Sequence, residues 1–123
     1  MALLRVPAAP PRTQQIGSVR VTFATDPRLP WTGSTRVALS ISNTDGSAVT
    51  DAGVSLTYDM QTDGSGRPMV GTSPPGRATA RMESPGRYVA PVTFTLAGQW
   101  AVRVSIDRGG RQEGQGMFLV VVR

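Results

Sequence analysis

The stretch that decides the fold is GRYVAPVTFTLAGQWAVRVSI, residues 86–106. Apolar and polar residues alternate through both of its halves. The alternating apolar residues are Tyr88, Ala90, Val92 and Phe94 in the first half, and Trp100, Val102, Val104 and Ile106 in the second. A period of two is that of a β-strand with one buried face. The stretch therefore predicts two strands, with Trp100 as the main aromatic side chain of the core.

The same alternation recurs on both sides of this stretch. It is found in five further segments, 19–23, 37–41, 54–58, 78–82 and 116–122. Turn-forming pairs such as Asp45-Gly46 and Gly109-Gly110 separate the segments, and no helical period is visible. About seven short antiparallel strands joined by turns predict an all-β, immunoglobulin-like β-sandwich.

The length of 123 residues suits a single domain. Residues 1–16 include a proline-rich run and predict a disordered arm, so that residues 17–123 form the sandwich domain. The segment from Gln61 to Gly76 is rich in Gly and Pro and predicts a long loop.

The composition argues against an enzyme. The chain has no Cys and no His, which excludes disulfides, thiolate metal sites and a Ser-His-Asp triad. Asp45, Asp51, Asp59 and Asp63 lie close in sequence but lack the ligand spacing of a calcium-binding EF-hand loop. They are interpreted as turn formers and solvated strand ends.

The net charge of +5 comes from 13 basic residues, all of them arginine. Seven of these could form a basic face: Arg67, Arg77, Arg81, Arg87, Arg103, Arg108 and Arg111. Nucleic-acid binding would also need exposed aromatic residues for stacking, and most of the seven aromatic residues fit inward-facing positions. A solvated surface is favoured, and no nucleic-acid partner is predicted.

Methionine is the remaining soft ligand. Met60 and Met69 flank the start of the predicted long loop and Met82 lies on the strand after it, so the three could converge at one end of the sandwich. Thioethers select Cu(I) over harder ions. The alternative is that Met60 and Met82 fill the edge of the core. Both interpretations stay open.

The pairs Gly86-x-Tyr88 and Gly98-x-Trp100 give the chain a resemblance to a known family, supported upstream by residues 45–54, DGSAVTDAGV. This pattern resembles the YtkA-like and FixH family of small extracytoplasmic domains. The resemblance implies an immunoglobulin-like sandwich outside the cytoplasm, with a role in copper handling or in assembling copper-containing membrane oxidases. Met60 and Met69 occupy the region of the family's methionine motif, whose compact spacing is interrupted here, and Leu96 stands at its second methionine position.

The resulting hypothesis is a non-enzymatic module in the periplasm or at the cell surface. It would bind Cu(I) through Met60, Met69 and Met82, with copper or membrane-oxidase assembly proteins as partners. We expect its export signal to lie outside the printed sequence, and any membrane attachment to use an anchor that is also outside it. The alternative is a structural or interaction module of a cell-envelope complex without metal, which docks through an exposed strand edge or through residues 61–76.

Overall fold

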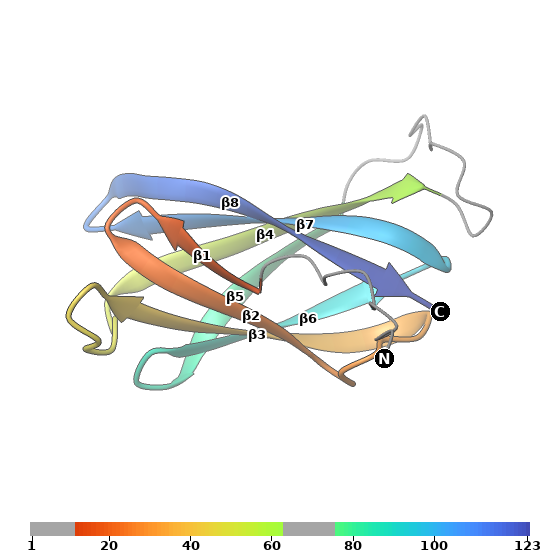
Figure 1. Ribbon diagram of the computed structural model, residues 1–123, viewed down its shortest axis with the longest axis horizontal. Helices are drawn as coiled ribbons and strands as arrows, with labels where there is room; N and C mark the ends of the chain where they lie inside the picture. Colours follow the sequence, from red (N-terminus) through yellow and green to blue (C-terminus); the bar gives the residue numbers. More distant parts are fainter. Residues whose placement is uncertain (1–11, 63–75) are drawn as a thin grey trace, which may run out of the picture.

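The computed structural model describes residues 12–62 and 76–123, which form eight antiparallel strands and no helix (Figure 1). The strands are β1 (Thr13–Ile16), β2 (Val19–Asp26), β3 (Gly33–Asn43), β4 (Ala52–Thr62), β5 (Gly76–Ser84), β6 (Arg87–Phe94), β7 (Gly98–Arg108) and β8 (Arg111–Val122). The described stretches accordingly contain no helix that is long and apolar enough to cross a membrane.

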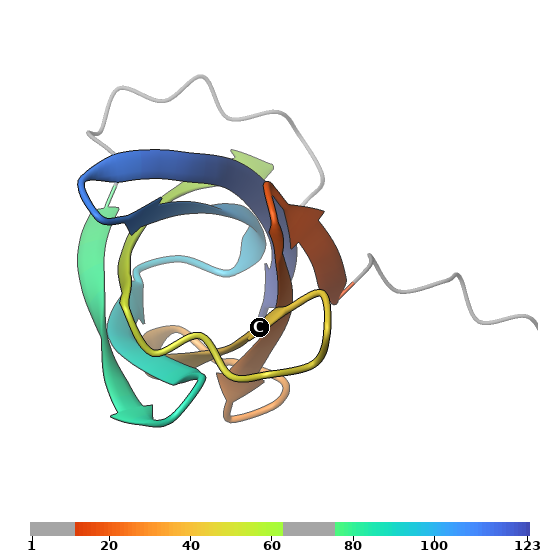
Figure 2. The same cartoon turned by 90° about the vertical axis from the view of Figure 1, so that its left-hand side faces the viewer.

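The sheet order is β1-β2-β3-β6-β5-β4-β7-β8. Strands β2, β3, β6 and β5 form one half and β4, β7 and β8 the other, which is the strand arrangement of an immunoglobulin-like sandwich. Strand β5 pairs with both β6 and β4, and thereby joins the halves into one nearly closed, barrel-like sheet (Figure 2). The prediction of an all-β antiparallel domain is confirmed.

Strand β1 closes the remaining seam of the barrel. The sequence assigned residues 13–16 to the arm, but they pair with β2 and lie beside β8. Gly17 makes the turn at φ 60°, a conformation that favours glycine, and the Ile16 side chain is buried. Gln14 donates its side-chain N–H to the Met117 carbonyl oxygen on β8 at 2.6 Å. Residues 1–11 of the predicted arm and 63–75 of the predicted loop lie outside the described residues.

The core fills the space between the two halves, and it consists of the inward-facing residues of the strands. Phe23 and Phe118 stack at 4.8 Å between ring centroids, and Phe94 packs against Trp100 at 5.2 Å. The Trp100 side chain is 7% exposed, so its predicted place in the core is confirmed. Full burial of such large apolar side chains contributes roughly 1.5–3 kcal/mol each.

Candidate functional sites at the two ends of the barrel

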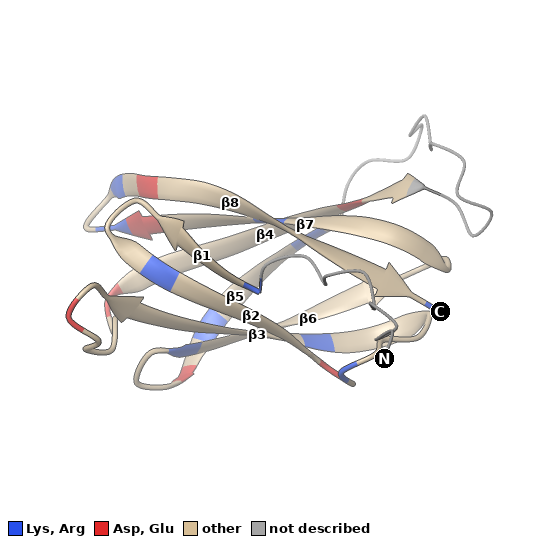
Figure 3. Ribbon diagram, in the orientation of Figure 1, with Lys and Arg blue, Asp and Glu red and all other residues tan. Residues whose placement is uncertain are grey.

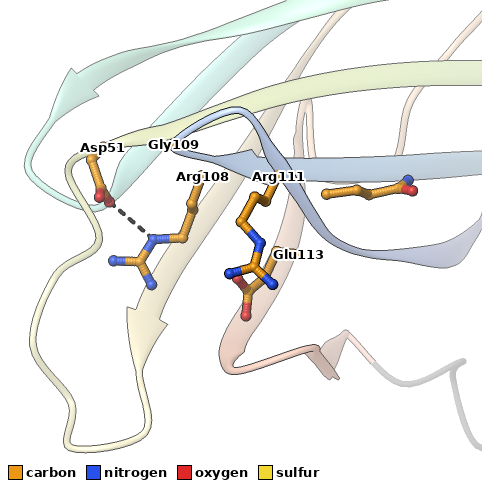
Figure 4. A pocket seen from close by; sticks show the side chains of 6 residues that line it. Asp51, Arg108, Gly109, Arg111 and Glu113 are labelled. Atoms are coloured by element: carbon orange, nitrogen blue, oxygen red, sulfur yellow. Dashed lines mark hydrogen bonds and ion pairs between the residues drawn. The ribbon is translucent and has the colours of Figure 1, made fainter.

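Charged residues gather at one end of the barrel, which we call the polar end (Figure 3). It comprises residues 17–18, 43–51 and 107–113, that is, the β1–β2 turn, the β3–β4 loop and the β7–β8 turn with the strand residues next to it. A shallow depression of about 440 Å³ lies here, lined by Asp51, Arg108, Gly109, Arg111, Gln112 and Glu113 (Figure 4). Its side chains combine both signs of charge.

Four of the six charged side chains of the polar end, those of Asp45, Asp51, Arg108 and Glu113, have hydrogen-bond partners within the chain. Arg108 donates from Nε to Asp51 Oδ1 at 3.1 Å and from Nη1 to Asn43 Oδ1 at 3.3 Å. Glu113 accepts hydrogen bonds from the Ser18 backbone N–H, at 2.7 Å, and from the Ser18 hydroxyl. These bonds connect three chain segments, so the arrangement serves to hold this end together.

Two carboxyl groups at the polar end have shifted pKa values. The side-chain and backbone hydrogen bonds from Ser18 lower the pKa of Glu113 below its ordinary value of 4.5, and the positive charges of Arg108 and Arg111 act in the same direction. The side-chain and backbone hydrogen bonds from Ser47 lower the pKa of Asp45. A general acid or base at neutral pH needs a pKa raised toward 7, and these shifts run the other way.

The aspartates that are neighbours in sequence do not meet in the structure. Asp45 accepts from the Ser47 N–H at 2.9 Å, which is the turn-forming role predicted for it. Asp51 pairs with Arg108 and Asp59 pairs with Arg103, at 2.6 Å. Asp63 lies outside the described residues. Within 12–62 and 76–123, no three acidic side chains come together in a way that could hold a metal ion.

In the described residues, the opposite end of the barrel carries several exposed apolar side chains. We call it the apolar end and define it by residues 27–32 of the β2–β3 loop, residues 95–97 of the β6–β7 loop and residues 121–123. It carries four of the large apolar side chains that are exposed in the described structure: Leu29 (55%), Trp31 (61%), Leu96 (54%) and Val121 (68%). Solvent exposure of several such side chains at one place is typical of a surface that docks on a partner.

Backbone pairing brings these segments together. The Thr32 N–H donates to the Arg123 carbonyl oxygen and the Arg123 N–H donates to the Pro30 carbonyl oxygen, both at 3.0 Å. These two bonds fix the backbone on either side of Trp31. The Trp100 indole N–H donates to the Leu96 carbonyl oxygen at 2.9 Å and holds the second loop in the same way. The exposed side chains are therefore carried by an anchored backbone.

The register shows that the two loops share one end of the barrel. Gly33, directly after the first loop, pairs with Phe94, directly before the second. Gly98, directly after the second loop, pairs with Val122. This surface was not predicted from the sequence, although the sequence contains a signal for it: Leu29, Trp31 and Leu96 are large apolar residues in segments that have no strand period.

The charged side chains of the apolar end are those of Arg28 and Arg123, and Asp26 lies directly before it at the end of β2 (Figure 3). Among the described residues, neither arginine forms a salt bridge. Salt bridges link Arg36 and Arg87 to Glu83, Arg103 to Asp59, and Arg108 to Asp51. Of the arginines proposed from the sequence as a basic face, Arg67 lies outside the described residues. The other six are divided between the polar end and the barrel wall, and two of them have acidic partners on that wall.

The methionines predicted as ligands occupy different places. Met60 is half-buried near the end of β4 and packs against the core, in register with Trp100. Met82 lies on β5 with its side chain 44% exposed. Met69 lies outside the described residues.

The β4–β5 register sets the separation of Met60 and Met82. Val54 pairs with Ala80; Met82 lies two residues to one side of this pair and Met60 six residues to the other. Eight residues of extended strand span about 26 Å. Two ligands of one ion must both contact it, so the structure does not bring Met60 and Met82 into a common site. As one site, the three methionines do not fit a copper ion.

The terminal strands of the sheet also leave little edge for docking. Strands β1 and β8 lie beside each other, and the β2–β3 loop pairs with Arg123 beyond the end of β8. These contacts shield backbone N–H and C=O groups that would be free for a partner at the edge of an unclosed sheet. The exposed strand edge considered from the sequence is therefore reduced in the described structure.

Comparisons with known proteins agree with this fold. Among curated proteins, none matches the sequence significantly. The solved structure of the PmoD soluble domain from Methylocystis sp. ATCC 49242 (Rockwell) is similar with a TM-score of 0.57 and 18% identity, over 91% of this chain and 97% of that one. A DUF4426 family protein from Pseudomonas aeruginosa PAO1 gives a TM-score of 0.50 and 10% identity, over 89% and 92%. At these identities the two structures show a common fold.

The sequence itself identifies the family. The family described as YtkA-like matches residues 13–105, from β1 to the second half of β7. This range contains the turn and strand residues on which the resemblance was based, including both the Gly-x-Tyr and the Gly-x-Trp pairs. The chain belongs to the YtkA-like family.

Proposed function

We propose that this chain is a non-enzymatic, extracytoplasmic accessory module that acts by binding a partner in the cell envelope through its apolar end. The observation that carries the proposal is the group formed by Leu29, Trp31, Leu96 and Val121, exposed on an anchored backbone. Exposing such side chains to water is unfavourable, and covering them on a partner surface recovers that free energy.

Three further features support binding over catalysis. The chain lacks His and Cys, which supply the commonest general base and the strongest nucleophile. The carboxylates with shifted pKa values are stabilised in their ionised form. The YtkA-like family is not known as enzymatic.

Membership of the YtkA-like family supports the proposed extracytoplasmic location, because the resemblance to that family implies a domain outside the cytoplasm. Because the chain has no Cys, one introduced cysteine labels a single position. Gln112→Cys, exposed at the polar end, should react with a membrane-impermeant maleimide in spheroplasts of the native host. Labelling only after the cells are lysed would contradict an extracytoplasmic location.

Site-specific photocrosslinking tests the binding end. A benzoylphenylalanine residue at Leu96, in the β6–β7 loop, should give crosslinked products in the envelope of the native host. The same residue at Gln112, at the polar end, is the matched control and should give few. Equal crosslinking from both positions, or none from Leu96, would contradict the proposal.

A second candidate function is Cu(I) binding through Met60 with Met69. The observation that favours it is the half-buried thioether of Met60, which lies at the border of the core near the apolar end. Thioether ligands favour Cu(I), and the register removes Met82 from such a site. The Cu(I) site would then lie at the end of β4, and copper or oxidase-assembly proteins would be the partners.

Anaerobic titration against a Cu(I) chelator tests this second candidate. The double variant Met60→Leu, Met69→Leu should lose the ability to compete, whereas Met82→Leu should compete as well as the wild type. These exchanges conserve side-chain volume, so folding should be little affected. Equal competition by all three proteins would remove the thioether site.

A further inference from the structure

The loops of the apolar end combine large apolar side chains with positive charge. Trp31 follows Leu29 and Pro30 in a segment that begins at Pro27, with Arg28 inside it. Arg123 contacts the same segment through its backbone. Trp is enriched where membranes meet water, because its ring is apolar and its indole N–H is polar.

The two loops that carry Leu29, Trp31 and Leu96, and Arg123 beyond the last strand, lie at one extremity of the molecule (Figure 1). Loop side chains at an extremity can enter the boundary between lipid headgroups and acyl chains while the strands, with their paired backbone, stay outside it. Leu29, Trp31 and Leu96 meet this condition because they lie between strands. Val121, on the outward face of β8, extends the apolar surface onto the barrel wall.

The described acidic side chains lie mostly away from the apolar end. Four of the described carboxylates, Asp45, Asp51, Asp107 and Glu113, lie at the polar end (Figure 3). Asp59 and Glu83 form salt bridges with arginines of the barrel wall. Asp26, at the end of β2, is the described acidic side chain nearest in sequence to Arg28. An anionic surface would therefore attract the apolar end more than the polar end.

We propose that the apolar end docks on an anionic lipid bilayer, with Leu29, Trp31 and Leu96 in the interfacial layer and Arg28 and Arg123 at the headgroup phosphates. The inference rests on the proposed function and names the partner surface of that same end. Apolar loops with adjacent arginines match both the acyl and the phosphate layer of such a membrane.

Tryptophan fluorescence tests the proposal, because the two tryptophans have different environments. Trp31 is exposed and Trp100 is buried, so insertion changes the environment of Trp31 alone. With vesicles of phosphatidylcholine and phosphatidylglycerol, the emission of the full 123-residue chain should shift to shorter wavelength. In Trp31→Phe the shift should be absent, because Trp100 already lies in the core. An unshifted wild-type spectrum at excess lipid would overturn the proposal.

Co-sedimentation with the same vesicles separates the apolar from the charged contribution. Trp31→Ser combined with Leu96→Ser should reduce partitioning about tenfold or more, since binding scales with buried apolar area. Arg28→Gln should reduce it on anionic vesicles and leave the weak binding to pure phosphatidylcholine unchanged. Met82→Ser removes an exposed apolar side chain from the barrel wall and is the matched control. A loss with Met82→Ser equal to that of the double variant would overturn the proposal.

The outcomes distinguish this inference from the proposed function. Protein crosslinks from Leu96 without vesicle binding would overturn the lipid inference and leave a protein partner at the same end. Vesicle binding together with lipid crosslinks from Leu96 supports both. No crosslinks from Leu96 and no vesicle binding would overturn both.

Discussion

At the polar end of the barrel, four of the six charged side chains (Asp45, Asp51, Arg108 and Glu113) are hydrogen-bonded within the chain, whereas at the apolar end large side chains remain more than half exposed. Arg108 joins the β3–β4 loop to the β7–β8 turn, and Glu113 joins β8 to the β1–β2 turn at Ser18. At the apolar end, the hydrogen bonds of the described residues hold the backbone, at Arg28, Thr32, Arg123 and Leu96 among other positions.

The difference indicates where binding takes place. Polar groups that satisfy one another inside the chain have little left to offer a partner, so the polar end is interpreted as structural. Covering exposed apolar side chains with another surface lowers the free energy of the system, so the apolar end is interpreted as the binding end. The following predictions test this division, from the largest expected effect to the smallest.

The largest expected effect is a difference in stability between variants of the two tryptophans. Trp100→Ala should lower the free energy of unfolding by about 3–5 kcal/mol, because it leaves a cavity beside Phe94 and removes the bond to Leu96. Trp31→Ala should change it by about 0.5 kcal/mol or less, because the Trp31 side chain is exposed. Urea unfolding of the two variants measures both values. A comparable loss in Trp31→Ala would mean that Trp31 is structural and would remove it from the binding surface.

An intermediate effect concerns the loop of the polar end. The buried Tyr88 hydroxyl donates to the Val49 carbonyl oxygen at 2.9 Å and accepts from the Ala52 N–H at 3.2 Å. Tyr88→Phe should lower the free energy of unfolding by about 1–3 kcal/mol, since it leaves buried backbone groups without partners. Amide hydrogen exchange should show faster exchange at Ala52 and unchanged exchange in the β6–β7 loop. Equal acceleration at both places would contradict independent ends.

The smallest effect depends on pH. Hydrogen bonds from Ser18 hold the pKa of Glu113 below its ordinary value of 4.5, so its ionised form is favoured in the folded state. A carboxyl group with a lowered folded-state pKa stabilises the protein above the unfolded-state pKa and loses this effect as the pH falls through the folded-state value. Glu113→Gln should therefore lower the Tm at pH 7 and have less effect as the pH falls below about 4.5.

The control for this prediction is Gln112→Ala, which removes no titratable group and should shift the Tm equally at each pH. A Tm difference for Glu113→Gln that is constant between neutral and acid pH would show that Ser18 does not favour the carboxylate. Thermal unfolding followed by circular dichroism over that pH range supplies the measurement.

Strands were predictable where the burial of one face imposes an alternation. This holds for the stretch around Trp100, where even-numbered residues face the core. It fails for β1, whose sequence TQQI contains one apolar residue. Ile16 is buried because Gly114 and Gly116 on β8 leave room for it, and that pairing joins residues about one hundred positions apart.

The sites were less predictable because they depend on register and topology. Proximity in sequence suggested that Met60 and Met82 converge, but an antiparallel hairpin places residues on opposite sides of a pair far apart along the strands. The apolar end joins Trp31 to Leu96 through the pairing of β3 with β6 and of β7 with β8. The turn at Gly109-Gly110 indicates the hairpin of β7 with β8, but no local pattern encodes the pairing of β3 with β6.

The most direct test of the binding end compares single cysteines in the native envelope with the same cysteines in the purified chain. Leu96→Cys and Gln112→Cys are each the sole thiol of their variants, because the chain has none of its own. We expect maleimide labelling of Leu96→Cys to be strongly slowed in the envelope, and labelling of Gln112→Cys to proceed at the rate of the purified chain. Slowing at Gln112 with free labelling at Leu96 would contradict the account and assign binding to the polar end.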